Sequence, residues 1–253
     1  MLTALLSPVV KVGRFGIFAG KLALRLLRGP WYLRRTIEHL AWTFSRCVWV
    51  VAAVVMALGM VIALQGLEVF DLFGAHRLLA ALVSASVLRE LSPVLASVLV
   101  AAQGGSAVAA QLASMNSREE LDATAVMGVD PMALHVLPRA AGLALAAPLL
   151  HLVGVIAGIT GGLVTAVVFR HEQAGVLVNE LWAFTAPIDI VSGLVKSTVF
   201  GIIIGALAAW HGTHARPDAV GVGRAVNDTV VHTVTAFIVA NYFLSTAFFG
   251  AVS

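Results

Sequence analysis

Four charged residues that fall inside long apolar stretches are the first candidates for chemistry in this sequence. They are Arg89, Glu90, Asp189 and Lys196. A charge at membrane depth costs about 2.5–3.5 kcal/mol on insertion scales, so each one needs a partner or an aqueous cavity. Adjacent helical residues point about 100° apart, so Arg89 and Glu90 are expected to meet groups on other helices rather than each other.

Two interpretations of these charges stay open. In the first, they neutralise one another inside a helical bundle, with Asp189 and Lys196 seven residues apart on one face of a single helix. In the second, they border a cavity for a ligand with a charged end and an apolar body, and Arg89 meets its phosphate or carboxylate. The two interpretations are compatible with each other.

The sequence offers no other convergent set of reactive groups. No serine, cysteine or histidine arrangement indicates a nucleophile, and no Gly-x-x-x-x-Gly-Lys-Ser/Thr loop is present to cradle phosphates. His211 and His214 are three residues apart without a further ligand near them, which favours a loop pair over a metal site. We therefore expect no catalytic residue and no metal, and the chain is not expected to hydrolyse a nucleotide unaided.

The composition is that of an integral membrane protein. Hydrophobic residues make up 60% of the 253 positions and charged residues 11%, against roughly 45–50% and about 25% in soluble proteins. The pI near 9.5 does not indicate a nucleic-acid partner, because the cations are not spread as a binding groove requires. Eight of the sixteen Lys and Arg residues precede Val48.

Five apolar regions are long enough to cross a bilayer, which takes about 20 residues per helix. The predicted spans cover residues 47–67, 78–115, 138–169, 188–210 and 230–250. The second and third are longer than one crossing requires, so a tilt, a break or an extension beyond the membrane is expected. In the second span Arg89, Glu90 and Pro93 interrupt the apolar run. The predicted fold is an all-α membrane protein forming one domain over residues 1–253.

Residues 8–28 ahead of the first span are predicted to form an amphipathic helix in the headgroup plane. Their cations recur at helical spacing and fall within one arc: Lys11, Arg14, Lys21, Arg25 and Arg28. Such a helix lies with its apolar side down and its cations facing anionic lipid. The alternative is a disordered basic tail.

Basic residues flanking the spans set the orientation, because Lys and Arg in short loops stay cytoplasmic. The N-terminal region, the loop after the second span and the loop after the fourth span hold most of them. The N-terminus is therefore expected in the cytoplasm, and five crossings place Ser253 outside.

A polar segment between the second and third spans is expected on the cytoplasmic side. Ser117 and Glu120 have the spacing of a reciprocal capping box, and Gly128 is a plausible stop, so a helix is predicted over about 117–128. Asp130 is expected to cap a second helix whose first turn holds Pro131. Such a helix would let an external protein push on the spans; the alternative is an ordinary solvated loop with one helical turn.

Several motifs occur in the order typical of one family. They are Leu88-Arg89-Glu90-Leu91-Ser92-Pro93-Val94, Gly104-Gly105-Ser106-Ala107, Glu119-Glu120-Leu121-Asp122-Ala123, Met127-Gly128-Val129-Asp130-Pro131, Lys196-Ser197-Thr198-Val199-Phe200-Gly201 and Gly223-Arg224-Ala225. On these motifs the chain resembles the MlaE (YrbE) family over roughly residues 10 to 250.

The resemblance implies a permease subunit of an ABC transporter that works with MCE-domain proteins. Such systems move phospholipids or related amphiphiles between the bacterial inner membrane and the outer envelope. The resemblance further implies an interfacial helix, five spans and two permease copies, identical or diverged, around a central lipid cavity. A separate cytoplasmic ATPase pair would bind the ATP, so the permease itself needs no cofactor and catalyses nothing.

The resemblance also assigns roles to residues. Arg89 would lie near the lipid head, and the cavity lining would include Glu90, Leu91, Ile62, Val69, Phe70 and Phe73. The segment that begins near Ser117 would be the coupling helix seated in the ATPase, with contacts from Ser117, Glu119, Glu120, Asp122, Asp130 and Pro131. The family commonly has a glutamate where this chain has Ala125, which leaves Glu119, Glu120 and Asp122 as the acidic candidates.

Two rival functions make different predictions. A secondary transporter would use Arg89, Glu90, Asp189 and Lys196 to relay protons and would run on an ion gradient without a nucleotide. A membrane-embedded enzyme would need a convergent catalytic set, which the sequence does not show.

Overall fold

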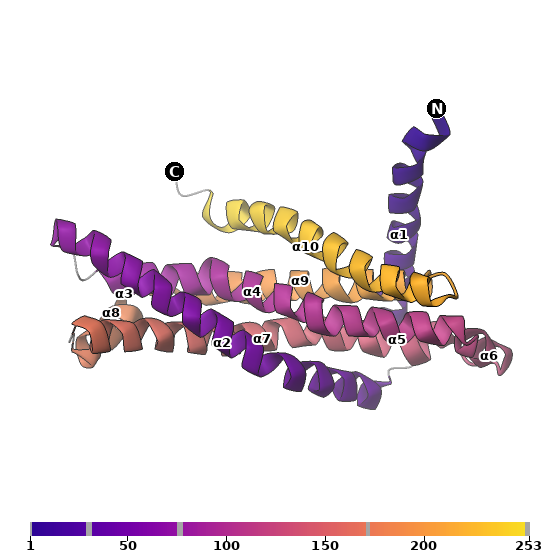
Figure 1. Cartoon of the computed structure of the whole chain (residues 1–253), viewed down its shortest axis with the longest axis horizontal. Helices are drawn as coiled ribbons and strands as arrows, with labels where there is room; N and C mark the ends of the chain where they lie inside the picture. The colour runs from indigo at the N-terminus through magenta and orange to yellow at the C-terminus, as the bar shows by residue number, and fades with distance from the viewer. Residues whose placement is uncertain (1, 29–31, 75–77, 171–172, 251–253) are drawn as a thin grey trace.

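The computed structural model describes residues 2–28, 32–74, 78–170 and 173–250, and every regular element in these ranges is a helix. The side chains of residues 2–9, 11, 12, 27, 28, 73 and 170 lie outside the description. Figure 1 shows the long helices running along one common axis, with α1 standing across the bundle near the end that carries α6.

Five helical segments in the described ranges are long and apolar enough to cross a membrane. They are α2 (Leu33–Phe73), the composite segment Leu78–Ser117, α7 (Leu137–Arg170) with the preceding turn, α9 (Pro187–Thr213) and α10 (Ala219–Phe249). This confirms the predicted all-α fold with five spans. The first and last of these helices begin well before their apolar runs, because a run marks membrane depth while polar residues continue the helix outside it. Thus α2 begins at Leu33, and Asp218 caps α10 by accepting from the Gly221 amide.

The second span is one continuous but irregular helix. It consists of α3 (Leu78–Ser86), η1 (Val87–Leu91), α4 (Ser92–Leu99), η2 (Val100–Gly105) and α5 (Ser106–Ser117), in which η1 and η2 are π-helical. The expected interruption at Arg89 and Glu90 is therefore a π-helical stretch. Pro93 lies two residues after the end of this stretch and has no N–H to donate to the Arg89 carbonyl four residues earlier. A widened turn at this point is a common response to a lost ladder bond.

The core forms where α2, α7 and α9 approach closely along the bundle. A Cβ at Gly59 of α2 would lie 2.2 Å from the Gly158 carbonyl oxygen of α7, and one at Gly205 of α9 would lie 2.4 Å from the Ala140 oxygen. Only glycine permits backbones to pack this closely, which is how helices associate without a water-driven force. These contacts fix the positions of the spans around the polar groups described below.

A short helix that the sequence did not predict, α8 (Ala174–Phe184), lies between α7 and α9. Its residues Leu177 and Leu181 are buried. Figure 1 places it at the end of the bundle opposite α6. Its eleven residues are too few for a crossing, so a search for spans passes over it.

The N-terminal segment forms one helix, α1 (Leu2–Arg28), in place of a disordered tail. Phe18 and Leu22 are buried against the bundle, and the Phe18 ring lies 5.3 Å from that of Trp210. Ile17 and Leu24 on the same helix remain exposed. A helix crossing the bundle axis with exposed apolar residues fits the predicted position in the headgroup plane. The Lys11 and Arg28 side chains of the predicted cationic arc lie outside the described residues.

Candidate functional site

The four charged residues in the spans come together as two ion pairs between helices, which we call the polar cluster. Arg89 Nε lies 2.8 Å from Asp189 Oδ1, and Lys196 Nζ lies 2.7 Å from Glu90 Oε1. The turn η1 supplies Arg89 and Glu90, and α9 supplies Asp189 and Lys196. The expectation of mutual neutralisation is confirmed, and each residue of the adjacent pair in η1 meets a charge on α9.

Lys196 is completely buried, with all three ammonium hydrogens engaged. Its Nζ donates to the Glu90 carboxylate at 2.7 Å, to the Ser245 hydroxyl at 2.7 Å and to the Arg89 backbone carbonyl at 2.8 Å. The Arg89 carbonyl is the group that Pro93 leaves without its normal helical donor. The proline and the irregular turn therefore explain why a buried lysine is stable here.

The last span closes the polar cluster from a third side. Asn241 Nδ2 donates to Glu90 Oε2 at 2.9 Å, and the Ser245 hydroxyl donates to Glu90 Oε1 at 2.9 Å. The Phe249 ring lies under the Arg89 guanidinium, 4.4 Å from Cζ, which is a cation–π contact. The sequence analysis did not predict that Ser245 and Phe249 take part in this cluster.

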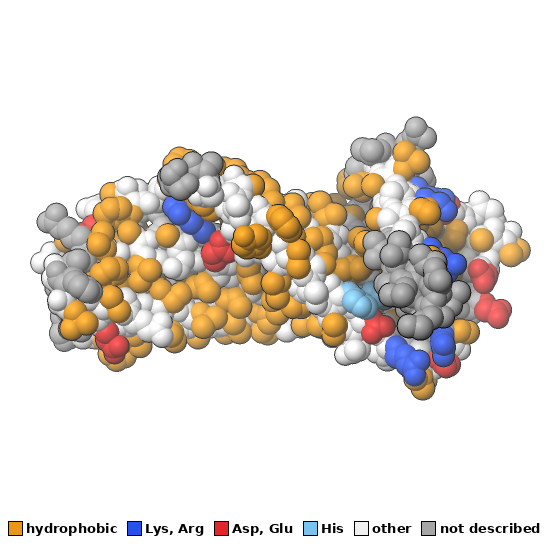
Figure 2. Space-filling model, turned by 90° about the horizontal axis from the view of Figure 1, so that it is seen from above, with side chains coloured by type: hydrophobic (Ala, Val, Ile, Leu, Met, Phe, Trp, Pro, Cys, Tyr) orange, Lys and Arg blue, Asp and Glu red, His pale blue; other side chains and the backbone are white. Residues whose placement is uncertain are grey.

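The polar cluster has a closed side and an open side. Lys196 and Asp189 are 0% and 1% exposed, whereas the side chains of Arg89 and Glu90 are 36% and 44% exposed. Figure 2 shows charged side chains gathered at one end of the molecule and a smaller group of both signs interrupting the apolar surface elsewhere. Among the described residues, the terminal nitrogens of Arg89 have no hydrogen-bond partner, because only Nε binds Asp189. An oxyanion could therefore bind to them in the two-point fashion that guanidinium favours.

The predicted cavity residues lie on α2 and η1. Ile62, Phe70 and Leu91 are partly buried against a hydrophobic cluster that joins α2, α3, α7 and α8. Val69 is exposed, and the Phe73 side chain lies outside the described residues. The structure of one chain thus brings Leu91 next to Arg89 and Glu90 in η1, while the α2 residues mainly pack the neighbouring helices.

The polar segment after the second span contains a short helix, α6 (Glu120–Val126), within the predicted range of 117–128. The predicted capping box is wrong: α5 continues to Ser117, and no side chain caps α6. Instead Glu119, with a φ of 57°, turns the chain between the two helices. The predicted stop at Gly128 is confirmed by its φ of 79°. The Asp130 cap is also confirmed, because its Oδ1 accepts from the Met132 amide at 3.0 Å, just after Pro131.

The surface of α6 combines carboxylates with an apolar tip. Glu119, Glu120 and Asp122 are exposed, while Leu121 and Thr124 are buried and hold the helix in place. Val126 and Met127 are 88% and 74% exposed. In the sequence this tip appears as two apolar residues directly before Gly128, which the predicted ATPase contacts did not include. An exposed apolar tip flanked by carboxylates is suited to a protein partner.

Polar contacts join α6 and the residues that flank it to three other parts of the chain. The Thr124 hydroxyl lies 3.3 Å from His135 Nε2, in the turn η3 (Met132–Val136) that leads into α7. Asn116 donates to the Ala215 carbonyl, between α9 and α10, at 3.1 Å. Arg25 of α1 forms an ion pair with Asp130. A force applied to α6 would therefore reach several spans.

Comparison with known proteins identifies relatives over most of the chain. Residues 36–247 match the family model described as Permease MlaE. A probable ABC transporter permease protein of Rickettsia felis is 34% identical over 94% of this chain and 92% of its own. The intermembrane phospholipid transport system permease protein MlaE of Haemophilus influenzae is 32% identical over 77% of this chain and 75% of its own. The chloroplastic protein TRIGALACTOSYLDIACYLGLYCEROL 1 of Arabidopsis thaliana is 31% identical over 92% of this chain and 67% of its own.

Proposed function

Because the chain belongs to the MlaE permease family, we propose that it carries a phospholipid or related amphiphile through the bacterial inner membrane as the permease of an ABC transporter. Membership of this family also confirms the expectation of a non-catalytic membrane subunit. The ATP would be bound by a separate cytoplasmic ATPase pair. A second permease copy and an MCE-domain protein complete the proposed assembly.

The observation that carries the lipid proposal is the half-open polar cluster. Buried Lys196 and Asp189 hold Glu90 and Arg89 in place, while the Arg89 side chain is 36% exposed and its terminal nitrogens have no partner among the described residues. A phosphate can bind these nitrogens without breaking the Arg89–Asp189 bond, so the buried carboxylate keeps its partner. Acyl chains would then lie along the apolar faces of the neighbouring spans.

The proposed coupling between ATPase and lipid runs along one span. The helix α6 directly follows α5, and α5 belongs to the same composite segment as η1, which carries Arg89 and Glu90. The two ends of this path lie roughly 40 Å apart at about 1.5 Å per helical residue. Two π-helical turns interrupt the path, and such turns are places where a helix bends. We infer that movement of α6 in its ATPase changes the exposure of the polar cluster.

The proposed orientation places α6 and the N-terminus in the cytoplasm. Charged side chains gather at the end of the molecule that carries α1 and α6 (Figure 2), as expected of cytoplasmic flanks. The least buried of the five candidate spans is α10, so lipid or a second permease copy would cover its outward face.

The lipid proposal can be tested by identifying what the purified complex holds. Mass spectrometry of the complex is expected to find phospholipid, and Arg89→Lys is expected to retain several-fold less, because lysine keeps the charge but not the two-point geometry. The exposed Arg46, which stacks on Trp42 at 4.8 Å, supplies the matched control Arg46→Lys. Equal lipid retention in all three proteins would remove Arg89 from the lipid site.

The secondary-transporter alternative predicts a different energy source. A proton relay through Arg89, Glu90, Asp189 and Lys196 would support lipid movement in vesicles with an imposed pH gradient and no ATP. The proposed permease requires ATP and its ATPase. Gradient-driven transfer by the chain alone would contradict the proposal.

A further inference from the structure

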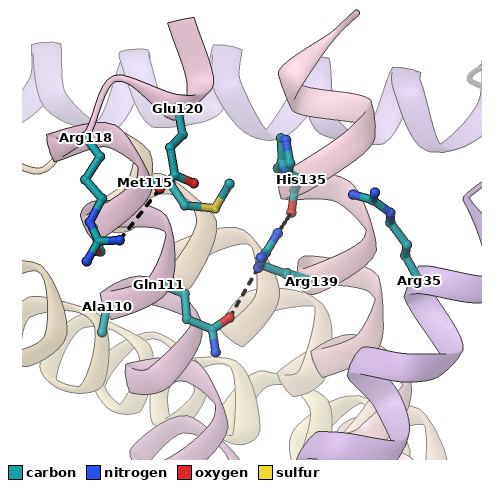
Figure 3. Close-up of a pocket in the computed structure, with 9 residues that line it drawn as sticks. Arg35, Ala110, Gln111, Met115, Arg118, Glu120, His135 and Arg139 are labelled. Atoms are coloured by element: carbon teal, nitrogen blue, oxygen red, sulfur yellow. Dashed lines mark hydrogen bonds and ion pairs between the residues drawn. The ribbon is translucent and has the colours of Figure 1, made fainter. Parts of the chain in front are cut away.

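A groove of about 580 Å³ lies beside α6, far along the chain from the polar cluster. Its walls come from α2, α5, α6, η3 and the start of α7. Figure 3 shows three arginines around it, with Arg35 and Arg139 near His135 and with Arg118 on the opposite side, close to Glu120. The proposed lipid site at the polar cluster does not use this groove, although Glu120 of its lining also belongs to the proposed ATPase surface.

The arginines of the groove carry more positive charge than the surrounding carboxylates balance. Among the described residues, Glu120 is the only carboxylate in the lining, and its Oε1 lies 4.0 Å from Arg118 Nη1, the limit of an ion pair. Among the described residues, neither Arg35 nor Arg139 has a carboxylate within ion-pair distance. With His135 neutral, three arginines and one glutamate leave two positive charges in the groove.

Neutral hydrogen-bond acceptors hold two of these arginines together. Arg139 Nη1 donates to the His135 carbonyl at 2.7 Å, and Arg139 Nε donates to Gln111 Oε1 at 3.3 Å. Arg35 Nη1 donates to the Leu134 carbonyl at 3.3 Å. Two like charges are thus fixed on consecutive carbonyls of η3. A bound anion would relieve their repulsion, and its oxygens would match the planar donor pattern of guanidinium.

Aromatic residues place the groove at the level of lipid headgroups. Trp42 lies seven residues after Arg35 on α2, and Trp210 packs on Phe18 of α1. Tryptophans at helix ends mark the membrane interface, and α1 crosses the bundle at the same end (Figure 1). The ion pair between Arg25 and Asp130, the cap of η3, joins α1 to the element that holds two groove arginines.

We propose that this groove binds the phosphate group of an anionic lipid in the leaflet on the α6 side. The three guanidinium groups and Gln111 would contact the phosphate, and the neighbouring apolar residues Ala110 and Met115 would lie under the start of the acyl chains. A lipid held here would join α2, α5 and α7 beside the proposed coupling helix. This inference rests on the proposed membrane orientation and not on transport.

The test compares lipid retention by variants of the full chain. Purified protein in detergent is mixed with equal amounts of phosphatidylglycerol and phosphatidylcholine and examined by native mass spectrometry. One phosphatidylglycerol per chain is expected to be retained in preference to phosphatidylcholine. Each arginine removed should weaken binding about fivefold, so Arg35→Gln with Arg118→Gln should lose at least tenfold. Both side chains are exposed, so this pair of changes should leave the fold intact.

Arg34→Gln is the matched control. Arg34 is the neighbour of Arg35 on the same helix, its side chain is 92% exposed, and it pairs with Glu38 outside the groove. Equal retention of the two lipids by the wild type, or equal losses in Arg34→Gln and in the groove variant, would overturn the proposal. If the groove variant does not fold, it is replaced by Arg35→Lys with Arg118→Lys. This double variant should bind phosphatidylglycerol less tightly than the wild type does. Unchanged binding would count against the site.

Two further arms identify the source of the anion. In the first arm, an excess of inorganic phosphate is added. If it displaces phosphatidylglycerol and no preference between the two lipids remains, the groove binds free phosphate and the proposed lipid site is wrong. Expulsion of the lipid on addition of the ATPase would show that an acidic side chain of that subunit fills the groove, and would also overturn the proposal. ATP-driven transport is measured separately, so a failure of transport with intact phosphatidylglycerol retention contradicts only the proposed function.

Discussion

Replacing Lys196 by methionine tests whether the polar cluster stabilises the bundle as the structure indicates. The change keeps the length of a fully buried side chain but removes hydrogen bonds of 2.7, 2.7 and 2.8 Å to Glu90, Ser245 and the Arg89 carbonyl. Breaking a buried ion pair by removing one partner costs about 3–5 kcal/mol. Glu90 keeps the hydrogen bonds that Asn241 and Ser245 donate to it, which offset part of the loss, and we expect about 2–3 kcal/mol.

The assay is thermal unfolding of the detergent-purified chain, followed by the loss of monodisperse protein. For a chain of this length 1 kcal/mol corresponds to about 2–4 °C, so Lys196→Met should lower the midpoint by about 4–12 °C. Adding Glu90→Gln removes the charge left without its partner and should recover at least half of the loss. The exposed Lys21 provides the control Lys21→Met, which should change the midpoint little.

Two results would refute this reasoning. An unchanged midpoint for Lys196→Met would mean that the three hydrogen bonds offset the desolvation free energy of the ammonium group and give no net stabilisation. A double variant no more stable than the single one would mean that the unpaired Glu90 carboxylate is not the source of the loss.

Three further predictions concern the coupling segment and the core. Reversing Glu119 and Glu120 to lysine should release the ATPase during purification while the chain stays folded; full retention of the ATPase would exclude this surface. A cysteine introduced at Val126 should react with an impermeant reagent only from the cytoplasmic side, because the native Cys47 is buried; labelling from the periplasm would reverse the proposed orientation. Gly59→Ala should lower stability by about 1–3 kcal/mol, because its Cβ would lie 2.2 Å from the Gly158 oxygen; a thermal midpoint equal to that of the wild type would contradict the close contact of α2 and α7.

The membrane fold could be predicted because long apolar runs have few alternative explanations. Each predicted span corresponds to a helix in the structure, and α8 was missed because its eleven residues fall below the length of a crossing. The capping box at Ser117 failed for a local reason. The pattern Ser-x-x-Glu is informative only where a helix starts, and here α5 was still in progress at Ser117.

The four charged residues of the polar cluster could be predicted from the sequence, but their ion-pair partners could not. Sequence position identified the four charges, since each one interrupts an apolar run. Which carboxylate meets which cation depends on the rotation of α9 against the second span, and this rotation is set by packing such as that of Gly193 on the Leu88 carbonyl oxygen. The contributions of Ser245 and Phe249 depend on how α10 lies over the cluster, which no local pattern reports.

The position of α10 in the chain has a consequence for biogenesis. The chain inserts its second and fourth spans before the last one, so Glu90 and Lys196 enter the bilayer before Ser245 and Asn241 do. A nascent chain that stops at this stage has a Glu90 carboxylate without the hydrogen bonds from α10, because the fifth span has not yet been inserted beside it. Insertion of the final helix supplies the missing hydrogen-bond donors. A truncated product without that helix would expose the Glu90 carboxylate, a feature by which membrane proteases could recognise incomplete chains.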